Sequence, residues 1–275
     1  MRFFENIKDI ILCAIFSLKA YTLADLIRAK GVIFSLIGLA FWLILLILPI
    51  TLFARPDFAP STIAAYIFCG ILVFNVYSIA TWDWAWEMRL LINNNVLEYI
   101  IVSGRSPLVV YMGMIPVSLF WVSIITVIDY LVVSAFIAPP RLIVNDICIL
   151  MLSILIFLIV VFSYALLLAV VILISGTSGA IIEVFSWILP LATGGFTPLS
   201  YLPEPIRFIA LLTPFSYPAE MIRYSLGVAE TILPLHLMVS IGLCYSLSFF
   251  TFAVFMFKYG LNKVLKEGVK SLAVW

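Results

Sequence analysis

The stretch LPLATGGFTPLSYLPEPIRFIALLTPFSYPAEMIR, residues Leu189–Arg223, decides the fold of this chain. It interrupts a sequence that is otherwise apolar enough for a lipid environment. Five prolines follow a Gly-Gly pair, and each removes a backbone N–H donor and clashes with the preceding helical turn. One straight helix cannot contain them, so we expect short pieces near one membrane surface. The five are Pro198, Pro203, Pro205, Pro214 and Pro218.

Composition sets the class of the protein. The 275 residues are 65% hydrophobic and 11% charged, with a mean hydropathy of +1.25. Such a chain has too little polar surface to cover a water-soluble globule, and its charge-free runs are long enough to cross a bilayer. We therefore expect an all-α integral membrane protein with a single transmembrane domain, 1–275. A net charge of +1 without clustered Lys and Arg gives no basis for nucleic-acid binding.

The charge-free runs divide the chain into six predicted spans. Of the 15 Lys and Arg residues, only Arg55, Arg141, Arg207 and Arg223 fall on the side opposite the termini. The excess of cations on the other side predicts that both termini and a tail, 258–275, are cytoplasmic in a cell membrane. The proline-rich stretch would then face outward. The spans are about 31–54, 60–82, 107–137, 147–174, 180–197 and 232–257.

Residues 1–30 resemble a secretion signal only superficially. Lys8 and Asp9 interrupt the apolar patch, and there is no small-residue cleavage site. The spacing of Ile7, Ile10, Ile11, Ala14 and Leu18 suits one face of a helix, which favours an amphipathic helix on the cytoplasmic surface. The alternative is a tilted extension of the first span.

A second informative stretch, DWAWEMRLLINNNVLEYIIVSGRSP, covers Asp83–Pro107. Its three consecutive asparagines, 93–95, can cap a helix, and the apolar run 96–102 can form one or two turns. Gly104 and Pro107 then stop the helix and start another. The pattern predicts a short cytoplasmic helix before the third span. A solvated loop with a charged face is the alternative.

Together these two stretches resemble the type-2 permeases of ABC transporters, which are the membrane subunits of many exporters. The coupling helix of those permeases has an acidic residue after a leucine and a Ser-Pro pair entering the next span; here these are Leu97, Glu98, Ser106 and Pro107. The segment before their last span is matched in order by Gly195, Pro198, Leu202, Pro203, Pro214 and Arg223.

The resemblance implies a transport subunit that is not itself an enzyme. It would bind a cytoplasmic ABC ATPase, which carries the ATP and magnesium, and a second permease copy, identical or closely related. Glu98 would pair with a cation of the ATPase, and Leu97 and Tyr99 would anchor it. The coupling residues would be Val96, Leu97, Glu98, Tyr99, Gly104, Arg105, Ser106 and Pro107. An outer gate would contain Gly194, Gly195, Pro198, Leu202, Pro203, Pro214 and Arg223.

The residues themselves give no sign of catalysis. There is no Gly-x-x-x-x-Gly-Lys-Ser/Thr phosphate loop, so the chain is expected to bind no ATP or other cofactor. His236 is the one histidine, and no Cys or carboxylate cluster surrounds it. The cysteines Cys13, Cys69, Cys148 and Cys244 are too far apart for a metal or redox motif, so no metal site is expected.

Asp129 and Glu183 are acidic groups at or near membrane depth, where they tend to mark pathways or pairs. Each has a structural alternative: Asp129 can reach water or a neighbouring hydroxyl, and Glu183 can start a helix. A rival function is therefore a proton-coupled secondary transporter that uses both acids. A second rival is an intramembrane enzyme or a scaffold. The cargo stays open among drugs, lipids, glycans and peptides, and Trp82, Trp84 and Trp86 fit either an interfacial belt or a stacking track for sugars.

Overall fold

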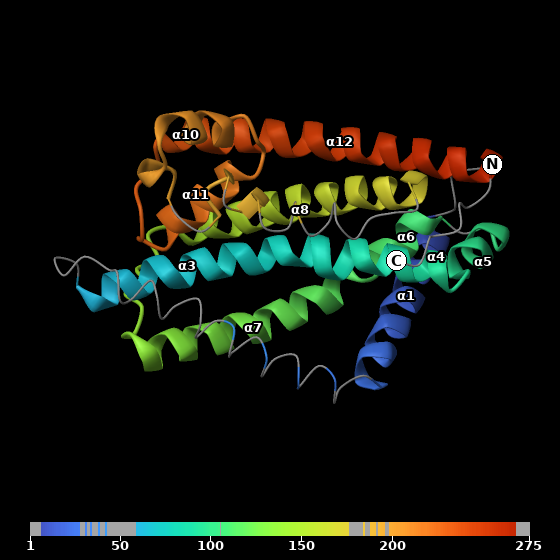
Figure 1. Cartoon of the computed structure of the whole chain (residues 1–275), viewed down its shortest axis with the longest axis horizontal. Helices are drawn as coiled ribbons and strands as arrows, with labels where there is room; N and C mark the ends of the chain where they lie inside the picture. The colour runs from blue at the N-terminus through green and yellow to red at the C-terminus, as the bar shows by residue number, and fades with distance from the viewer. Residues whose placement is uncertain are drawn as a thin grey trace.

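The computed structural model describes residues 7–27, 31, 34, 38, 42, 59–104, 106–175, 184, 188–190, 192–195 and 198–267. Within these ranges every regular element is a helix. The described part of the chain forms a bundle of long helices with short helices gathered at both ends (Figure 1).

Four helical stretches are long and apolar enough to cross a membrane, so the chain is a multi-pass membrane protein. The expected spans near 31–54 and 180–197 lie largely outside the described residues, and the total of six remains a prediction. The four stretches are Pro60–Asn93, Pro107–Phe136, Ile147–Ile174 and Leu235–Lys266.

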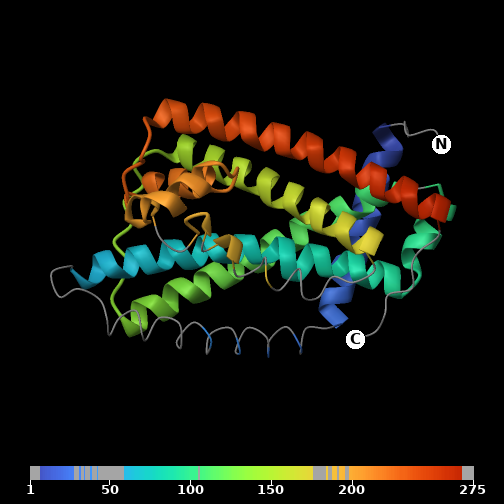
Figure 2. The same cartoon turned by 45° about the horizontal axis from the view of Figure 1, so that its top comes forward.

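Helix α8 (Ile147–Ser175) is the centre of the bundle. It packs against α12 (Leu235–Glu267), α11 (Ser216–Ser225) and the π-helix η1 (Ile79–Ala85). Helix α3 (Pro60–Ser78) pairs with α7 (Ile115–Phe136) on the other side of the bundle. We call the two ends of the bundle the α5 end and the α10 end, after the short helices that they carry (Figures 1 and 2).

The second span is longer than the 60–82 that we expected. Helix α3 continues through the seven-residue π-helix η1 (Ile79–Ala85) into α4 (Trp86–Asn93), which gives one helical path of 34 residues. Asp83, Glu87 and Arg89 suggested an exit from the membrane. After Pro60, however, the path contains no proline, and charged side chains alone do not end a helix.

The third span, expected at 107–137, is divided near its start. Helix α6 (Pro107–Met112) ends at a turn through Gly113, and Pro116 stands in the first turn of α7. Proline is tolerated there because its missing N–H would have no intrahelical acceptor. The turn brings Gly113 against α1, where a Cβ added to Gly113 would collide with the side chain of Ser17.

Helix α1 (Ile7–Ile27) lies across the α5 end and contacts α6 and α7 (Figures 1 and 2). Its inward side buries Ser17, whereas Ala14 and Leu18 of the predicted apolar face are only half-buried. At about 3.6 residues per turn, its exposed apolar side chains fall on the opposite side. Those residues are Ile11, Leu12, Ile15, Phe16, Leu23, Leu26 and Ile27.

Helix α12 begins just after Pro234 and runs to Glu267. We expected the last span to end near residue 257 and a tail to follow. Instead, residues 258–267 continue the helix past the apolar segment, since no proline interrupts them and Gly260 packs within the helix against Val170 of α8. Residues 268–275 of the predicted tail lie outside the described residues.

Candidate functional site

A buried ion pair organises the α10 end of the bundle. Arg223 and Glu220 of α11 are each about 1% exposed, and Arg223 Nη1 donates to Glu220 Oε1 at 3.1 Å. The second guanidinium nitrogen of Arg223 donates to the Gly195 carbonyl at 2.6 Å. Glu220 Oε1 also accepts the backbone N–H of Leu199 at 2.9 Å. The pair therefore ties α11 to two points of the chain that precedes it.

Hydroxyl groups extend this network to the long helices. Ser216 Oγ donates to the Ala210 carbonyl or the Thr193 carbonyl, each at 2.8 Å. The Thr193 hydroxyl lies 2.7 Å from the Tyr77 hydroxyl of α3. Helices α3 and α11 are thus linked through polar groups that are buried among apolar side chains. A buried network with most members satisfied fixes one packing arrangement.

The prolines of this region stand where helices begin. Pro198 precedes the 3-10 turn η2 (Leu199–Tyr201), Pro203 precedes α10 (Glu204–Leu211), and Pro218 stands early in α11. These positions need no backbone N–H donor, which is why the sequence forms several short helices here. Pro214 lies in the turn between α10 and α11.

The predicted gate residues are only partly brought together. Gly195 and Arg223 are in direct contact through the 2.6 Å hydrogen bond, and Gly194 beside them adopts a positive φ of 76°. Pro198 is buried, Leu202 and Pro214 are half-buried, and Pro203 is exposed. Sequence reasoning missed Glu220, Tyr77, Thr193 and Ser216. The i,i+3 spacing of Glu220 and Arg223 could have revealed that pair, whereas the other three are single polar residues without such spacing.

Gly195→Ala is expected to destabilise the protein by about 1–3 kcal/mol, because the added methyl group overpacks a closed site. An ideal Cβ at Gly195 would lie 2.6 Å from the Pro190 oxygen and 2.9 Å from the Pro190 Cα, both in the backbone. Gly242→Ala on α12 is the control, since its closest neighbour is the Tyr217 Cβ at 3.3 Å. Equilibrium unfolding in mixed detergent micelles measures both. Equal stability of the two variants would contradict the overpacking.

The α5 end presents a short helix. Helix α5 (Val96–Val102) follows Asn95, whose φ of 57° turns the chain sharply. Leu97 is 1% exposed and packs in the core, whereas Tyr99 and Val102 are 75% and 85% exposed. Glu98 is exposed beside Tyr99. The burial of Leu97 differs from our expectation of an anchor on a partner: its side chain holds α5 to the bundle.

After α5 the helix stops and a new helix starts, as predicted. Gly104 has a φ of 75°, which only glycine adopts without strain. Ser106 precedes α6, and Pro107 occupies its first turn. Val96 is 38% exposed, and Arg105 lies outside the described residues. The segment is therefore a short helix closed by sharp turns on both sides.

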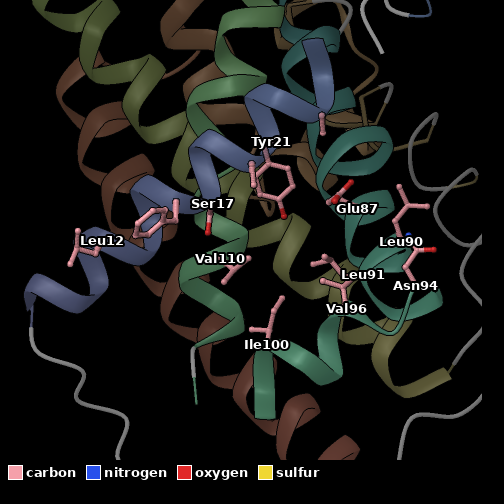
Figure 3. A pocket seen from close by; sticks show the side chains of 13 residues that line it. Leu12, Ser17, Tyr21, Glu87, Leu90, Leu91, Asn94, Val96, Ile100 and Val110 are labelled. Carbon is pink, nitrogen blue, oxygen red and sulfur yellow. The ribbon is translucent and has the colours of Figure 1, made fainter. Parts of the chain in front are cut away.

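A pocket of about 610 Å³ lies between α5 and the helices α1, α4 and α6 (Figure 3). Most of its wall is apolar, and its polar members come from α1 and α4. Burial raises the pKa of Tyr21 well above its ordinary value, with smaller contributions from the Glu87 and Asp83 carboxylates. Sequence reasoning gave no sign of this pocket because its walls are far apart in the chain. Lining residues include Ser17, Tyr21, Glu87, Asn94, Val96 and Ile100.

Asp129 lies inside the bundle on α7. It is 1% exposed, and its Oδ2 lies 2.5 Å from Nδ2 of Asn75 on α3. Its other oxygen, Oδ1, has no hydrogen-bond partner. The neighbour that we expected was water or a hydroxyl such as that of Thr126. Glu183 lies outside the described residues.

The three tryptophans near residue 84 separate into two environments. Trp82 and Trp86 are exposed, and the Arg89 guanidinium lies 5.0 Å from the ring centroid of Trp86. Trp84 is instead fully inside the core, where its Nε1 donates to Ser118 Oγ at 2.9 Å. Ser118 Oγ donates in turn to Asp83. Because Trp84 is buried, it belongs neither to an interfacial aromatic belt nor to an accessible stacking track for sugars.

Across the described ranges, no three His, Cys, Asp or Glu side chains gather in a way that could hold a metal ion. In comparisons with protein-family models and with curated proteins, nothing matches this chain.

Proposed function

We propose that this chain is the permease subunit of an ATP-driven exporter in a cell membrane, on the resemblance to type-2 ABC permeases. The structural feature that most supports the proposal is helix α5. It is a short helix with an apolar root, Leu97, and an outward side that offers Tyr99, Glu98 and Val102. A nucleotide-binding subunit can hold such a projecting helix in a cleft and move it.

The connection from α5 into the bundle supports a mechanical role. Only Asn94 and Asn95 separate α5 from α4, and α4 continues through η1 into α3. Force on α5 would therefore reach α3 along one helical path. In this proposal the α5 end and both termini face the cytoplasm, and a separate ATPase subunit binds and hydrolyses ATP with magnesium.

At the other end, the α10 region would form the outer gate. Its short helices leave backbone groups that can exist at membrane depth only when protein or a water-filled cavity covers them. The ion pair of Arg223 and Glu220 supplies part of that cover by binding the Gly195 carbonyl and the Leu199 N–H. In the proposed complex two permease copies, with six spans each, would enclose the path for a drug, lipid or glycan-like cargo.

Tyr99→Ala is expected to weaken ATPase binding about 30-fold, because a loss of about 2 kcal/mol is typical of an aromatic hot spot. The experiment co-expresses the tagged chain with a candidate ABC ATPase subunit from the same genome and measures the affinity of the purified subunits. Glu98→Lys should weaken binding as well. Tyr201→Ala is the matched control, since Tyr201 is 62% exposed at the opposite end of the bundle.

The same experiment can overturn the proposal. If Tyr99→Ala and Tyr201→Ala bind the ATPase as the unaltered chain does, α5 has no docking role. If the purified chain transports without any ATPase, the exporter class itself is wrong. Leu97→Ala separates anchoring from docking: it should lower the stability of the chain, whereas Tyr99→Ala should not.

A second candidate function is a proton-coupled secondary transporter. The burial of Asp129 with one unpartnered oxygen favours it, because a carboxyl at membrane depth can carry a proton. This transporter would stop when an uncoupler is added and would continue without the ATPase. An ATP-driven exporter would show the reverse dependence.

A further inference from the structure

The contact between Asp129 and Asn75 is the place where α7 meets α3 through polar groups. Both residues are buried, at 1% and 7% exposure, and the closest atoms lie 2.5 Å apart. Around them, the apolar residues Ile67, Ile71 and Val133 fill the same interface. Water is therefore excluded from the carboxyl group in this arrangement of the helices.

No charged group compensates Asp129 within these helices. Asp129 is the one charged residue of α7, and α3 and α8 contain none. Arg223 of α11 is already paired with Glu220. The other titratable side chains on α3 and α7 are tyrosines and a cysteine with neighbours of their own. Tyr77 bonds Thr193, Tyr66 lies against Tyr201, Tyr130 packs on Phe68, and Cys69 is buried. On α1, which also touches α7, Lys19 is exposed.

An ionised carboxylate would be costly in this site. It would have one amide donor, an orphan oxygen and an apolar surrounding, and a charge buried in this way tends to neutralise by binding a proton. A single carboxyl does not supply enough ligands for a metal cation. A proton needs no further ligand, so it suits the site as the described helices form it.

Asn75 can bond the acid in either of its protonation states. As placed, Nδ2 of Asn75 donates to Asp129 Oδ2 at 2.5 Å. The two ends of an asparagine amide are exchanged by a rotation about χ2. With Asn75 rotated, the Asp129 O–H donates to the Asn75 carbonyl oxygen, which an ionised Asp129 cannot do.

We propose that Asp129 holds a proton and that the neutral Asp129–Asn75 pair is a proton-dependent clamp between α7 and α3. Ionisation requires water or a cation to reach Asp129, and the surrounding apolar contacts must open first. Release of the proton is therefore coupled to separation of α3 from α7. Because α3 continues to α5, the clamp restrains the same helical path that the ATPase is proposed to move. The protonation itself does not depend on either proposed function.

Infrared spectroscopy of the purified full chain tests the proposal. At neutral pH, the spectrum should contain a carboxylic-acid C=O band that shifts in D₂O and is absent from Asp129→Asn. This variant keeps the shape of the side chain and can still bond Asn75, so it should fold. Glu98→Gln is the control: it removes an exposed acid and should leave the band unchanged.

Two further measurements complete the test. Aspartate labelled with carbon-13 at the carboxyl should shift the band without any substitution, so the test does not depend on folding of a variant. Asn75→Leu should move the band to higher frequency, because the acid then lacks its amide partner. Absence of an aspartic-acid band at neutral pH would overturn the proton site. A band that Asn75→Leu leaves unmoved would overturn the clamp.

Discussion

Replacing Arg223 by methionine is expected to lower the free energy of unfolding by about 3–5 kcal/mol, the usual loss when one member of a buried ion pair is removed. The variant leaves the Glu220 carboxylate, about 1% exposed, with the Leu199 N–H as its remaining partner. The Gly195 carbonyl also loses its 2.6 Å hydrogen bond from the guanidinium. Equilibrium unfolding in mixed micelles measures the loss.

Glu220→Gln distinguishes this explanation from a simple loss of packing. In the unaltered chain, the substitution should be destabilising, because it removes the charge that faces Arg223. In the Arg223→Met background it should cost less, since glutamine can still accept the Leu199 N–H and no buried charge remains. Strictly additive losses would mean that the two side chains do not act as a pair.

The coarse fold could be predicted because it depends on the lengths of the apolar segments. Four of the six expected spans match helices long enough to cross a membrane, and the start of α8 at Ile147 agrees with the prediction. The span ends were less predictable. We placed exits at charged residues such as Asp83 and Lys258, but the helices continue through both positions. A helix ends where its backbone hydrogen bonds end. Proline, or a glycine with positive φ such as Gly104 or Gly227, marks that point better than charge does.

The site residues divide in the same way. Gly104, Pro107 and Pro198 act on the local backbone, so their positions at turns and helix starts could be read from neighbouring residues. Asn75 and Thr193 act through partners far away in the sequence, and nothing near them indicates those partners. Polar pairs between residues that are far apart in an apolar sequence can be identified only when the packing of the helices is known.

Helix α5 shows how a correct local pattern can give the wrong side-chain direction. Its stop signals were recognised, but Leu97 was assigned to a partner although it is buried in the core. In a helix of two turns one side faces the bundle, and in α5 that side carries Leu97. A partner of α5 would therefore contact Tyr99 and Val102, which are on the outward side.

Trp84→Ala is expected to destabilise the protein by about 3–5 kcal/mol, as for other large aromatic side chains removed from a core. Trp84 is 1% exposed and stands in the π-helix η1, whose widened turn is a local departure from the α-helix. Its ring packs edge-on against Phe162 of α8 at 5.5 Å between centroids. Its N–H bonds Ser118 of α7. One side chain thus joins η1 to two neighbouring helices.

Two control variants separate the contributions of Trp84. Trp84→Phe keeps most of the packing and loses the N–H donor, so it should cost about 0.5–1.5 kcal/mol, the value of one hydrogen bond. Trp86→Ala should change stability by less than about 1 kcal/mol, because that ring is 41% exposed and faces Arg89. Because η1 leads directly into α4 and then α5, Trp84→Ala should also weaken ATPase binding, although Trp84 cannot touch a partner. A variant that loses stability but binds the ATPase unchanged would mean that η1 does not hold α5 in position.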